Sequence, residues 1–205
     1  MAARDSARIV MSETRPAPRR RPLALLADLD GTLLDSPLDL AALKREVGAR
    51  DTSILEHLAT LPLDEAARGW AIVAAHENRA AEHAVRAPGA ARLLAHCQAT
   101  GVVVAIVTNN SGEIVRPVLV RLGIDCAVVI AREDAAPKPA PEPILLALQR
   151  LGVSLADAAF LGDAELDVRA GAAAGIYTVH VGPHCEGHCQ AHAATLDEAW
   201  PLLGL

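Results

Sequence analysis

Short apolar runs alternate with longer amphipathic segments from residue 23 onward, and this alternation restricts the fold more than any other feature. It predicts strands near residues 23–28, 102–107, 126–130, 159–161 and 177–181. It also predicts helices, each followed by a glycine suited to a left-handed cap, over residues 89–100, 112–122, 141–151 and 165–174. Strands that alternate with helices form a parallel sheet covered on both faces. We therefore expect an α/β fold with a Rossmann-like three-layer αβα core and a parallel sheet.

The size and charge of the chain narrow its class further. With 205 residues, of which 52% are hydrophobic, it can bury the core of one domain, with or without an insert. The formal net charge of −6 argues against a general nucleic-acid binder. The sequence has no apolar run long enough to cross a bilayer and no ordinary signal segment. We expect a cytoplasmic protein with neither a nucleic-acid nor a membrane partner.

Two segments interrupt the alternation. Residues 1–21 have no apolar period and contain several arginines and prolines, so a mobile N-terminal leader is expected there. Residues 37–87 show helical patterns without strands, which predicts a helical cap inserted after the first strand. The α/β core then consists of residues 22–36 and 88–205.

The first apolar run ends in two carboxylates, Asp28 and Asp30, one residue apart. Alternate residues of an extended chain point the same way, so both side chains can project from the strand end before Gly31 and Thr32 turn the backbone. Two such carboxylates repel each other unless a cation or a proton lies between them. A carboxylate can also attack phosphorus while a partner carboxyl moves the proton that the leaving group needs. The pair is a candidate catalytic and metal site, although an Asp-Gly turn is also a common loop start.

Further polar residues follow the later strands. Thr108 and Asn109 come directly after one apolar run, and Asp163 and Asp167 come after another. Lys138 lies among prolines that restrict the backbone. An open α/β sheet binds its ligand at the carboxyl ends of its strands, so we expect these residues to meet at one edge.

These residues give the chain its similarity to a known family. It resembles the haloacid dehalogenase-like superfamily of phosphohydrolases, whose four motifs it carries in order as Asp28-Leu-Asp30-Gly31-Thr32, Thr108-Asn109, Lys138-Pro139 and Gly162-Asp163 with Asp167. The resemblance extends from about residue 23 to near residue 181. The superfamily includes phosphatases such as the phosphoglycolate phosphatases, which share the motif order and the cap position. The cap that the resemblance implies for this chain is short.

The resemblance implies a role for each motif residue. Asp28 is the nucleophile that forms an aspartyl-phosphate, and Asp30 protonates the leaving oxygen and later takes a proton from the attacking water. Thr108 and Asn109 supply donors to the phosphate, and Lys138 balances the charge of Asp28 and of the phosphate. The implied activity is hydrolysis of a small phosphorylated metabolite.

The resemblance also implies Mg²⁺ as the cofactor. Its ligands are the Asp28 side chain, the Asp30 main-chain carbonyl and Asp163, while Asp167 holds a metal-bound water or Lys138. Asp167 could instead serve only as an acid at a helix start.

Other functions remain open at this stage. Dehalogenating members of the family lack the second acid of the first motif, so Asp30 favours a phosphatase. A phosphomutase would keep both acids and return the phosphoryl group to its substrate. A weakly catalytic protein that binds a phosphorylated ligand or a partner is a third possibility.

A second group of candidate ligands follows the last predicted strand. His184, Cys185, His188 and Cys189 lie in pairs four residues apart, a spacing that could hold Zn²⁺ on one helix face. The alternative is a polar surface loop, because zinc sites usually draw ligands from two separate elements. Disulfides are not expected in a cytoplasmic chain.

Overall fold

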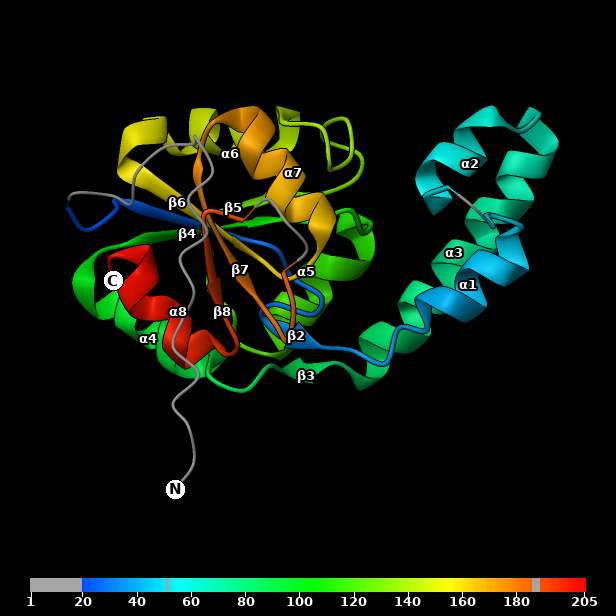
Figure 1. Ribbon diagram of the computed structural model, residues 1–205. Helices are drawn as coiled ribbons and strands as arrows, with labels where there is room; N and C mark the ends of the chain where they lie inside the picture. The colour runs from blue at the N-terminus through cyan, green and yellow to red at the C-terminus, as the bar shows by residue number, and fades with distance from the viewer. Residues whose placement is uncertain (1–19, 51, 186–188) are drawn as a thin grey trace, which may run out of the picture.

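A parallel sheet of six strands forms the centre of the protein, for which a computed structural model describes residues 20–50, 52–185 and 189–205 (Figure 1). The strand order is β5-β4-β1-β6-β7-β8, and all neighbouring pairs are parallel. The strands are β1 (Ala24–Ala27), β4 (Val103–Val107), β5 (Val128–Ile130), β6 (Ala158–Gly162), β7 (Tyr177–Val181) and β8 (Ala191–Ala193). The expected Rossmann-like α/β core is confirmed.

Helices cover both faces of this sheet and make the molecule three layers thick in its core. One face carries α4 (Ala90–Thr100), α5 (Gly112–Arg121) and α8 (Leu196–Leu203). The other face carries α6 (Glu142–Leu151) and α7 (Glu165–Ala174), with a single 3-10 turn at Leu155–Asp157. Left-handed glycines close α4, α6 and α7 as expected, and the left-handed Gly123, with a φ of +58°, follows α5 directly after its end at Leu122. None of the described helices is both long and apolar enough to span a membrane.

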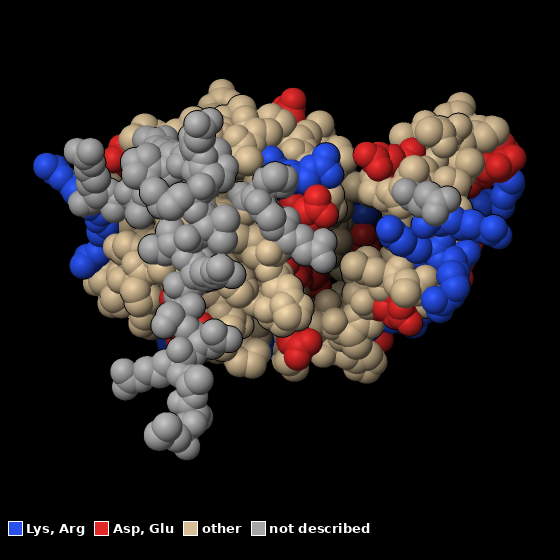
Figure 2. All heavy atoms as spheres, in the orientation of Figure 1, with Lys and Arg blue, Asp and Glu red and all other residues tan. Residues whose placement is uncertain are grey.

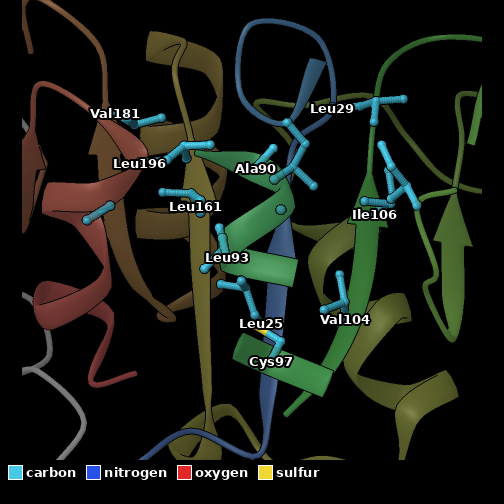
Figure 3. Packing of buried hydrophobic residues seen from close by; sticks show 14 of the residues in the cluster. Leu25, Leu29, Ala90, Leu93, Cys97, Val104, Ile106, Leu161, Val181 and Leu196 are labelled. Carbon is cyan, nitrogen blue, oxygen red and sulfur yellow. The ribbon is translucent and has the colours of Figure 1, made fainter. Parts of the chain in front are cut away.

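Alternate residues of the central strands point to opposite faces, and this separates the core into two clusters. Leu25 of β1 packs with Leu93 and Cys97 of α4 on one face (Figure 3). Leu26, the next residue, packs on the other face in the cluster that contains Phe160 and the buried side of α6. Strands buried on both faces are almost wholly apolar, which explains why they are recognisable as continuous runs in the sequence.

The segment between the first two core strands forms three helices at one side of the core (Figure 1). These are α1 (Leu40–Val47), α2 (Ile54–Thr60) and α3 (Leu63–His83), and they enclose a small apolar cluster of their own around Leu43, Leu58 and Val73. Two short antiparallel strands, β2 (Leu34–Asp35) and β3 (Val85–Arg86), join the segment to the core. We use the word cap for residues 37–87. The expected leader, residues 1–21, lies almost wholly outside the described residues.

The C-terminal part of the chain differs from the expectation. Residues 191–193 form the edge strand β8, parallel to β7, and α8 packs on the sheet after it. The prediction that disulfides are absent was wrong, since Cys185 and Cys189 are bonded to each other with their Cα atoms 6.6 Å apart. That prediction was based on the expected compartment, which does not restrict two cysteines so close in one connection. Cys97 and Cys126 are free.

Candidate active site

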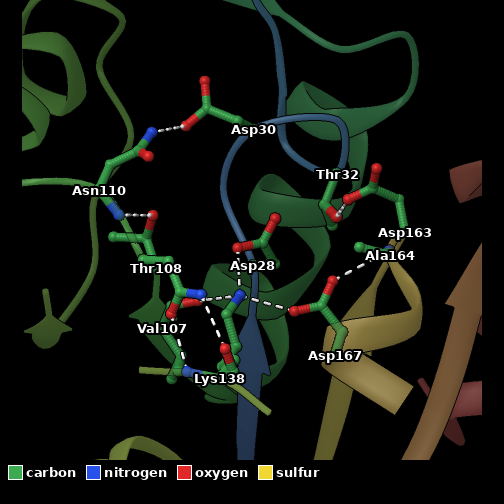
Figure 4. Close-up of polar contacts among 11 residues, drawn as sticks. Asp28, Asp30, Thr32, Val107, Thr108, Asn110, Lys138, Asp163, Ala164 and Asp167 are labelled. Carbon is green, nitrogen blue, oxygen red and sulfur yellow. Dashed lines mark hydrogen bonds and ion pairs between the residues drawn. The ribbon is translucent and has the colours of Figure 1, made fainter. Parts of the chain in front are cut away.

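The candidate site lies at the carboxyl ends of the central strands, where the strand order reverses. From β1 the chain reaches β4 on one side, and β6 pairs with β1 on the other. Such a reversal opens a crevice at the strand ends. Asp28 follows β1, Thr108 follows β4 and Asp163 follows β6, so the sheet itself brings three motifs together (Figure 4).

Lys138 lies at the centre of this site, between two aspartates (Figure 4). Its Nζ donates to Asp28 Oδ1 at 2.5 Å, to Asp167 Oδ1 at 2.6 Å and to the Val107 carbonyl at 3.0 Å. All three charged side chains are buried; Asp167 is 1% exposed. Charges this deep in a protein are tolerated only when they are paired and hydrogen-bonded. The lysine therefore holds the Asp28 carboxylate in one position at the tip of β1.

Negative charge exceeds positive charge in this buried cluster. Burial raises the pKa of Asp28 well above its usual value, and repulsion from Asp167 and Asp163 adds to the rise, although Lys138 opposes it. Burial alone would lower the pKa of Lys138, but its attraction to Asp167 and Asp28 is stronger and raises that pKa. The pKa of Asp163 is also raised, mainly by burial. A bound cation would relieve this excess of negative charge.

The donor set fits a hard divalent cation. Carboxylate oxygens of Asp28, Asp163 and Asp167 all lie within 4.8 Å of one another. Oxygen ligands in this number suit Mg²⁺, which keeps several of its waters and needs few protein ligands. Thr32 Oγ1 donates to Asp163 Oδ1 at 2.8 Å and orients that carboxylate. Gly31 makes the close approach possible, because a Cβ atom at this residue would lie 2.2 Å from Asp163 Oδ2.

Asp30 lies apart from this cluster and has different surroundings. Its carboxylate accepts hydrogen bonds from Ser36 Oγ and from Asn110 Nδ2, each at 2.7 Å. Burial raises the pKa of Asp30 in spite of these donors and of Lys138. A carboxyl with a raised pKa holds its proton more readily, as a general acid must.

The second motif, Thr108 and Asn109, contacts the loop that carries Lys138. Asn109 Nδ2 donates to the Lys138 carbonyl at 3.0 Å, and the Lys138 N–H donates to Asn109 Oδ1 at 2.9 Å. Both ends of the Asn109 amide thus fix the loop that carries the lysine, whose bond to Pro139 is cis. Thr108 is buried, and its hydroxyl oxygen accepts from the Asn110 N–H at 3.1 Å. That Thr108 and Asn109 donate to a phosphate stays a prediction.

The expected zinc site is not supported. The sulfurs of Cys185 and Cys189 are joined to each other and offer no thiolate. His184 is exposed, and His188 lies outside the described residues. Within residues 20–50, 52–185 and 189–205, the aspartate cluster at the sheet edge is the one group of acidic, histidine or cysteine side chains close enough to share a metal ion.

Three supporting residues were missed from the sequence. Ser36 and Asn110 bind Asp30, and Thr32 binds Asp163. Each is a small polar residue inside a motif or within a few positions of one, where a hydroxyl or an amide also fits an ordinary turn. Only the three-dimensional arrangement distinguishes the two roles.

Comparison with known proteins agrees with this geometry. The family model described as haloacid dehalogenase-like hydrolase matches residues 25–181, which is most of the chain and includes all four motifs. The chain belongs to the haloacid dehalogenase-like hydrolases. A solved haloacid dehalogenase-like hydrolase from Bacteroides fragilis has the same fold, with a TM-score of 0.72, 21% identity and coverage of 85% of this chain and 98% of that one.

Two curated relatives of this haloacid dehalogenase-like hydrolase are phosphatases. The phosphoglycolate phosphatase of Xanthomonas campestris pv. campestris is 32% identical over 183 residues, which cover 78% of this chain and 83% of that protein. The N-acetylmuramic acid 6-phosphate phosphatase of Pseudomonas putida is 28% identical over 182 residues, with coverage of 77% and 82%. Together with the family, these relatives assign the chain to the phosphoric monoester hydrolases.

Proposed function

We propose that this protein is a Mg²⁺-dependent phosphatase that hydrolyses a small phosphorylated metabolite through an aspartyl-phosphate on Asp28. The observation that carries the proposal is the Asp28 carboxylate, which Lys138 holds at the tip of β1 within reach of two further carboxylates. Phosphoryl transfer needs mainly positioning and neutralisation of charge, and these groups supply both.

In the first step, an Asp28 carboxylate oxygen attacks phosphorus and the ester P–O bond breaks. Asp30 gives its proton to the departing alkoxide oxygen, so the product alcohol leaves neutral and Asp30 becomes a carboxylate. In the second step, Asp30 takes a proton from a water molecule, whose oxygen attacks phosphorus. The bond between phosphorus and Asp28 breaks, and inorganic phosphate is released with the Asp28 carboxylate restored.

The remaining residues bind and orient the reacting groups. Lys138 orients Asp28 and opposes its protonation, and Asp167 keeps Lys138 in place. Asp28 and Asp163, with the main-chain carbonyl of Asp30, would hold Mg²⁺. The metal supplies neutralisation of the negative charge on the phosphate oxygens.

The two curated relatives guide the choice of substrate. Their names give two different phosphate esters, phosphoglycolate and N-acetylmuramic acid 6-phosphate, although both resemble this chain over about the same length. We therefore place the substrate in their shared class, a phosphate monoester of a small carboxylate-bearing metabolite. Phosphoglycolate is the first compound to test because its phosphatase has the higher identity.

The test measures phosphate release from p-nitrophenyl phosphate and from a panel of phosphorylated metabolites, with MgCl₂ and with EDTA. We expect turnover with magnesium and its loss in EDTA. Asp28→Asn should lower kcat by at least about 10³-fold, because loss of a nucleophile leaves only binding and electrostatic effects. Circular dichroism should show that the variant is folded.

Three outcomes would contradict the proposal. Unchanged turnover by Asp28→Asn would remove this residue as nucleophile. Conversion of a sugar phosphate to its isomer without phosphate release would favour a phosphomutase, and tight binding without any turnover would favour a binding protein.

A further inference from the structure

A second buried ion pair joins the cap to the core. Arg132, just after β5, donates from Nη1 to Glu77 Oε1 at 2.7 Å and from Nη2 to Glu77 Oε2 at 3.4 Å. The Glu77 side chain is 5% exposed and that of Arg132 is 16% exposed. Glu77 belongs to α3 of the cap, so the pair connects two parts of the molecule that are far apart in the sequence.

The cap contributes a second contact to the same arginine. The Arg132 guanidinium lies over the ring of Trp70, with its central carbon 4.7 Å from the ring centroid. Trp70 and Glu77 are seven residues apart on α3, which places them on one side of that helix two turns apart. One face of α3 thus presents an aromatic ring and a carboxylate to one core arginine, a combination that suits arginine and not lysine.

Arg132 is also connected to the candidate active site. Its main-chain N–H donates to the Asn110 carbonyl at 3.1 Å, and Asn110 Nδ2 donates to Asp30 Oδ2. A cavity of about 20 Å³ lies beside this connection, lined in part by Asp30, Glu77 and Asn110. That volume holds about one water molecule. The foot of the cap therefore lies beside a small cavity that Asp30, the proposed general acid, helps to line.

The last turns of α3 have a second anchor nearby. Arg121 of α5 donates to the Ala81 and Ala84 carbonyls at 2.6 and 3.1 Å, close to the point where the cap returns to the core. A contact at the return point alone would leave the rest of α3 able to tilt. The Arg132 contacts begin at Glu77, one turn before Ala81 toward the start of α3, and extend back to Trp70. They therefore restrict the tilt of the helix.

We propose that Glu77, Trp70 and Arg132 are positioning residues that fix the angle of the cap over the Asp30 pocket and thereby limit the substrates that the site accepts. The proposal rests on the proposed function, because it concerns access to that same site. A buried ion pair adds little net stability, since desolvation opposes its attraction. Its bidentate geometry does define one relative orientation of the two parts it joins.

Space around the cap agrees with this role. Figure 2 shows the surface hollowed between the core and the cap, with acidic side chains at its depth. A phosphorylated metabolite that enters through this hollow would pass between the core and the cap. A fixed cap angle would therefore select by the size and shape of the group attached to the phosphate.

Trp70 provides a readout that does not depend on activity. The chain has two tryptophans, and the other, Trp200, lies in α8 of the core beside His96. In a Trp200→Phe background, the emission of Trp70 reports directly on the contact with Arg132. The variants to compare are Glu77→Gln and Arg132→Lys; the second keeps the positive charge but cannot form the bidentate, stacked arrangement.

We expect each variant to lower the equilibrium constant for docking of the cap about tenfold, which corresponds to about 1.4 kcal/mol of lost coupling. Trp70 emission should shift to longer wavelength, and acrylamide should quench it more strongly. The double variant should show no larger change than either single variant, because the residues act as one unit. For p-nitrophenyl phosphate, KM should change while kcat stays within about twofold of the parent.

Arg92→Lys is the matched control, because Arg92 forms an exposed ion pair with Asp197 on the core. It should leave Trp70 emission unchanged. Unchanged emission and quenching in both Glu77→Gln and Arg132→Lys would overturn the inference, as would strictly additive effects in the double variant. Since the readout is fluorescence, failure of the inference and failure of the phosphatase proposal are distinguishable.

Discussion

Asp28 and Asp30 are separated by one residue, and their surroundings give them different chemistry. Asp28 contacts a buried lysine and shares its site with two other carboxylates. Asp30 contacts only neutral donors, from Ser36 and Asn110. Burial raises the pKa of both, but only Asp28 is directly paired with a lysine, which opposes its protonation and fixes its position. The pair can therefore divide the work into nucleophile and proton donor.

The role of Asp30 as proton donor can be tested by changing the leaving group. We expect Asp30→Asn to lower kcat/KM for alkyl phosphates about 10²–10⁴-fold, the usual contribution of general acid catalysis. With p-nitrophenyl phosphate, the rate of the first step should fall much less, because nitrophenolate leaves without a proton. Single-turnover measurement of nitrophenolate release isolates that step. Equal losses for both substrates would contradict the assignment.

Site residues that differ strongly in polarity from their sequence neighbours could be predicted from the sequence. Asp28 and Lys138 stand out because a carboxylate follows an apolar strand and a lysine lies among prolines. Arg132 and Glu77 could not be predicted, because single charges in a loop and on a helix are usually solvated. Their pairing depends on how α3 is placed against the core, which no local pattern encodes.

At the scale of elements, the core strands could be predicted and the short strands could not. β1, β4 and β6 are buried on both faces, so their residues form continuous apolar runs. β2 and β3 have two residues each, which is too short for any periodic signal. β5 and β8 have three residues each, but only β5 is part of an apolar run, since β8 has the sequence Ala-His-Ala. The histidines and cysteines before β8 suggested either a polar surface loop or a metal site, and neither interpretation predicts an edge strand.

The turn after β1 lies against Asp163, one of the proposed Mg²⁺ ligands. Gly31 has a φ of +86°, and a Cβ there would collide with the Asp163 carboxylate. We expect Gly31→Ala to displace Asp163 and to raise the magnesium concentration needed for half-maximal activity about 10–100-fold, as for other changes next to metal ligands. Activity measured across a MgCl₂ series tests this.

Gly152→Ala is the matched control for this prediction. Gly152 has a similar φ of +66°, but nothing lies within 4 Å of the position of its Cβ. Its substitution should cost about 1–2 kcal/mol of stability from backbone strain and leave the magnesium requirement unchanged. An equal change in both variants would show that strain, and not the contact with Asp163, is responsible.

At the scale of the whole molecule, the acidic cluster links stability to pH. The folded-state pKa values of Asp28 and Asp163 are raised, so the folded protein holds protons that the unfolded chain releases near its ordinary pKa of about 3.9. The unfolding free energy should therefore fall as pH rises from that value through the raised pKa values. Thermal unfolding in metal-free buffers across this range measures the effect.

Magnesium should reverse this loss, because it binds the ionised carboxylates of the folded state only. At about 100 times its dissociation constant the added stability is about 2.7 kcal/mol, which raises Tm by roughly 5–10 °C for a chain of this size. The increase should be larger at pH 7 than at pH 5. A similar increase from NaCl at equal ionic strength, or in Asp163→Asn, would contradict a specific site.

The pairing of β2 with β3 places Asp35 opposite Val85, so the chain leaves and re-enters the core at adjacent positions. Directly opposed residues of two antiparallel strands are only about 5 Å apart, a gap that a two-residue hairpin turn can bridge. Residues 36–84 therefore form an insertion whose two ends lie next to each other in the core. Excising it, or grafting in the equivalent helices of a related hydrolase, would leave the strand ends that carry the reacting groups covalently undisturbed.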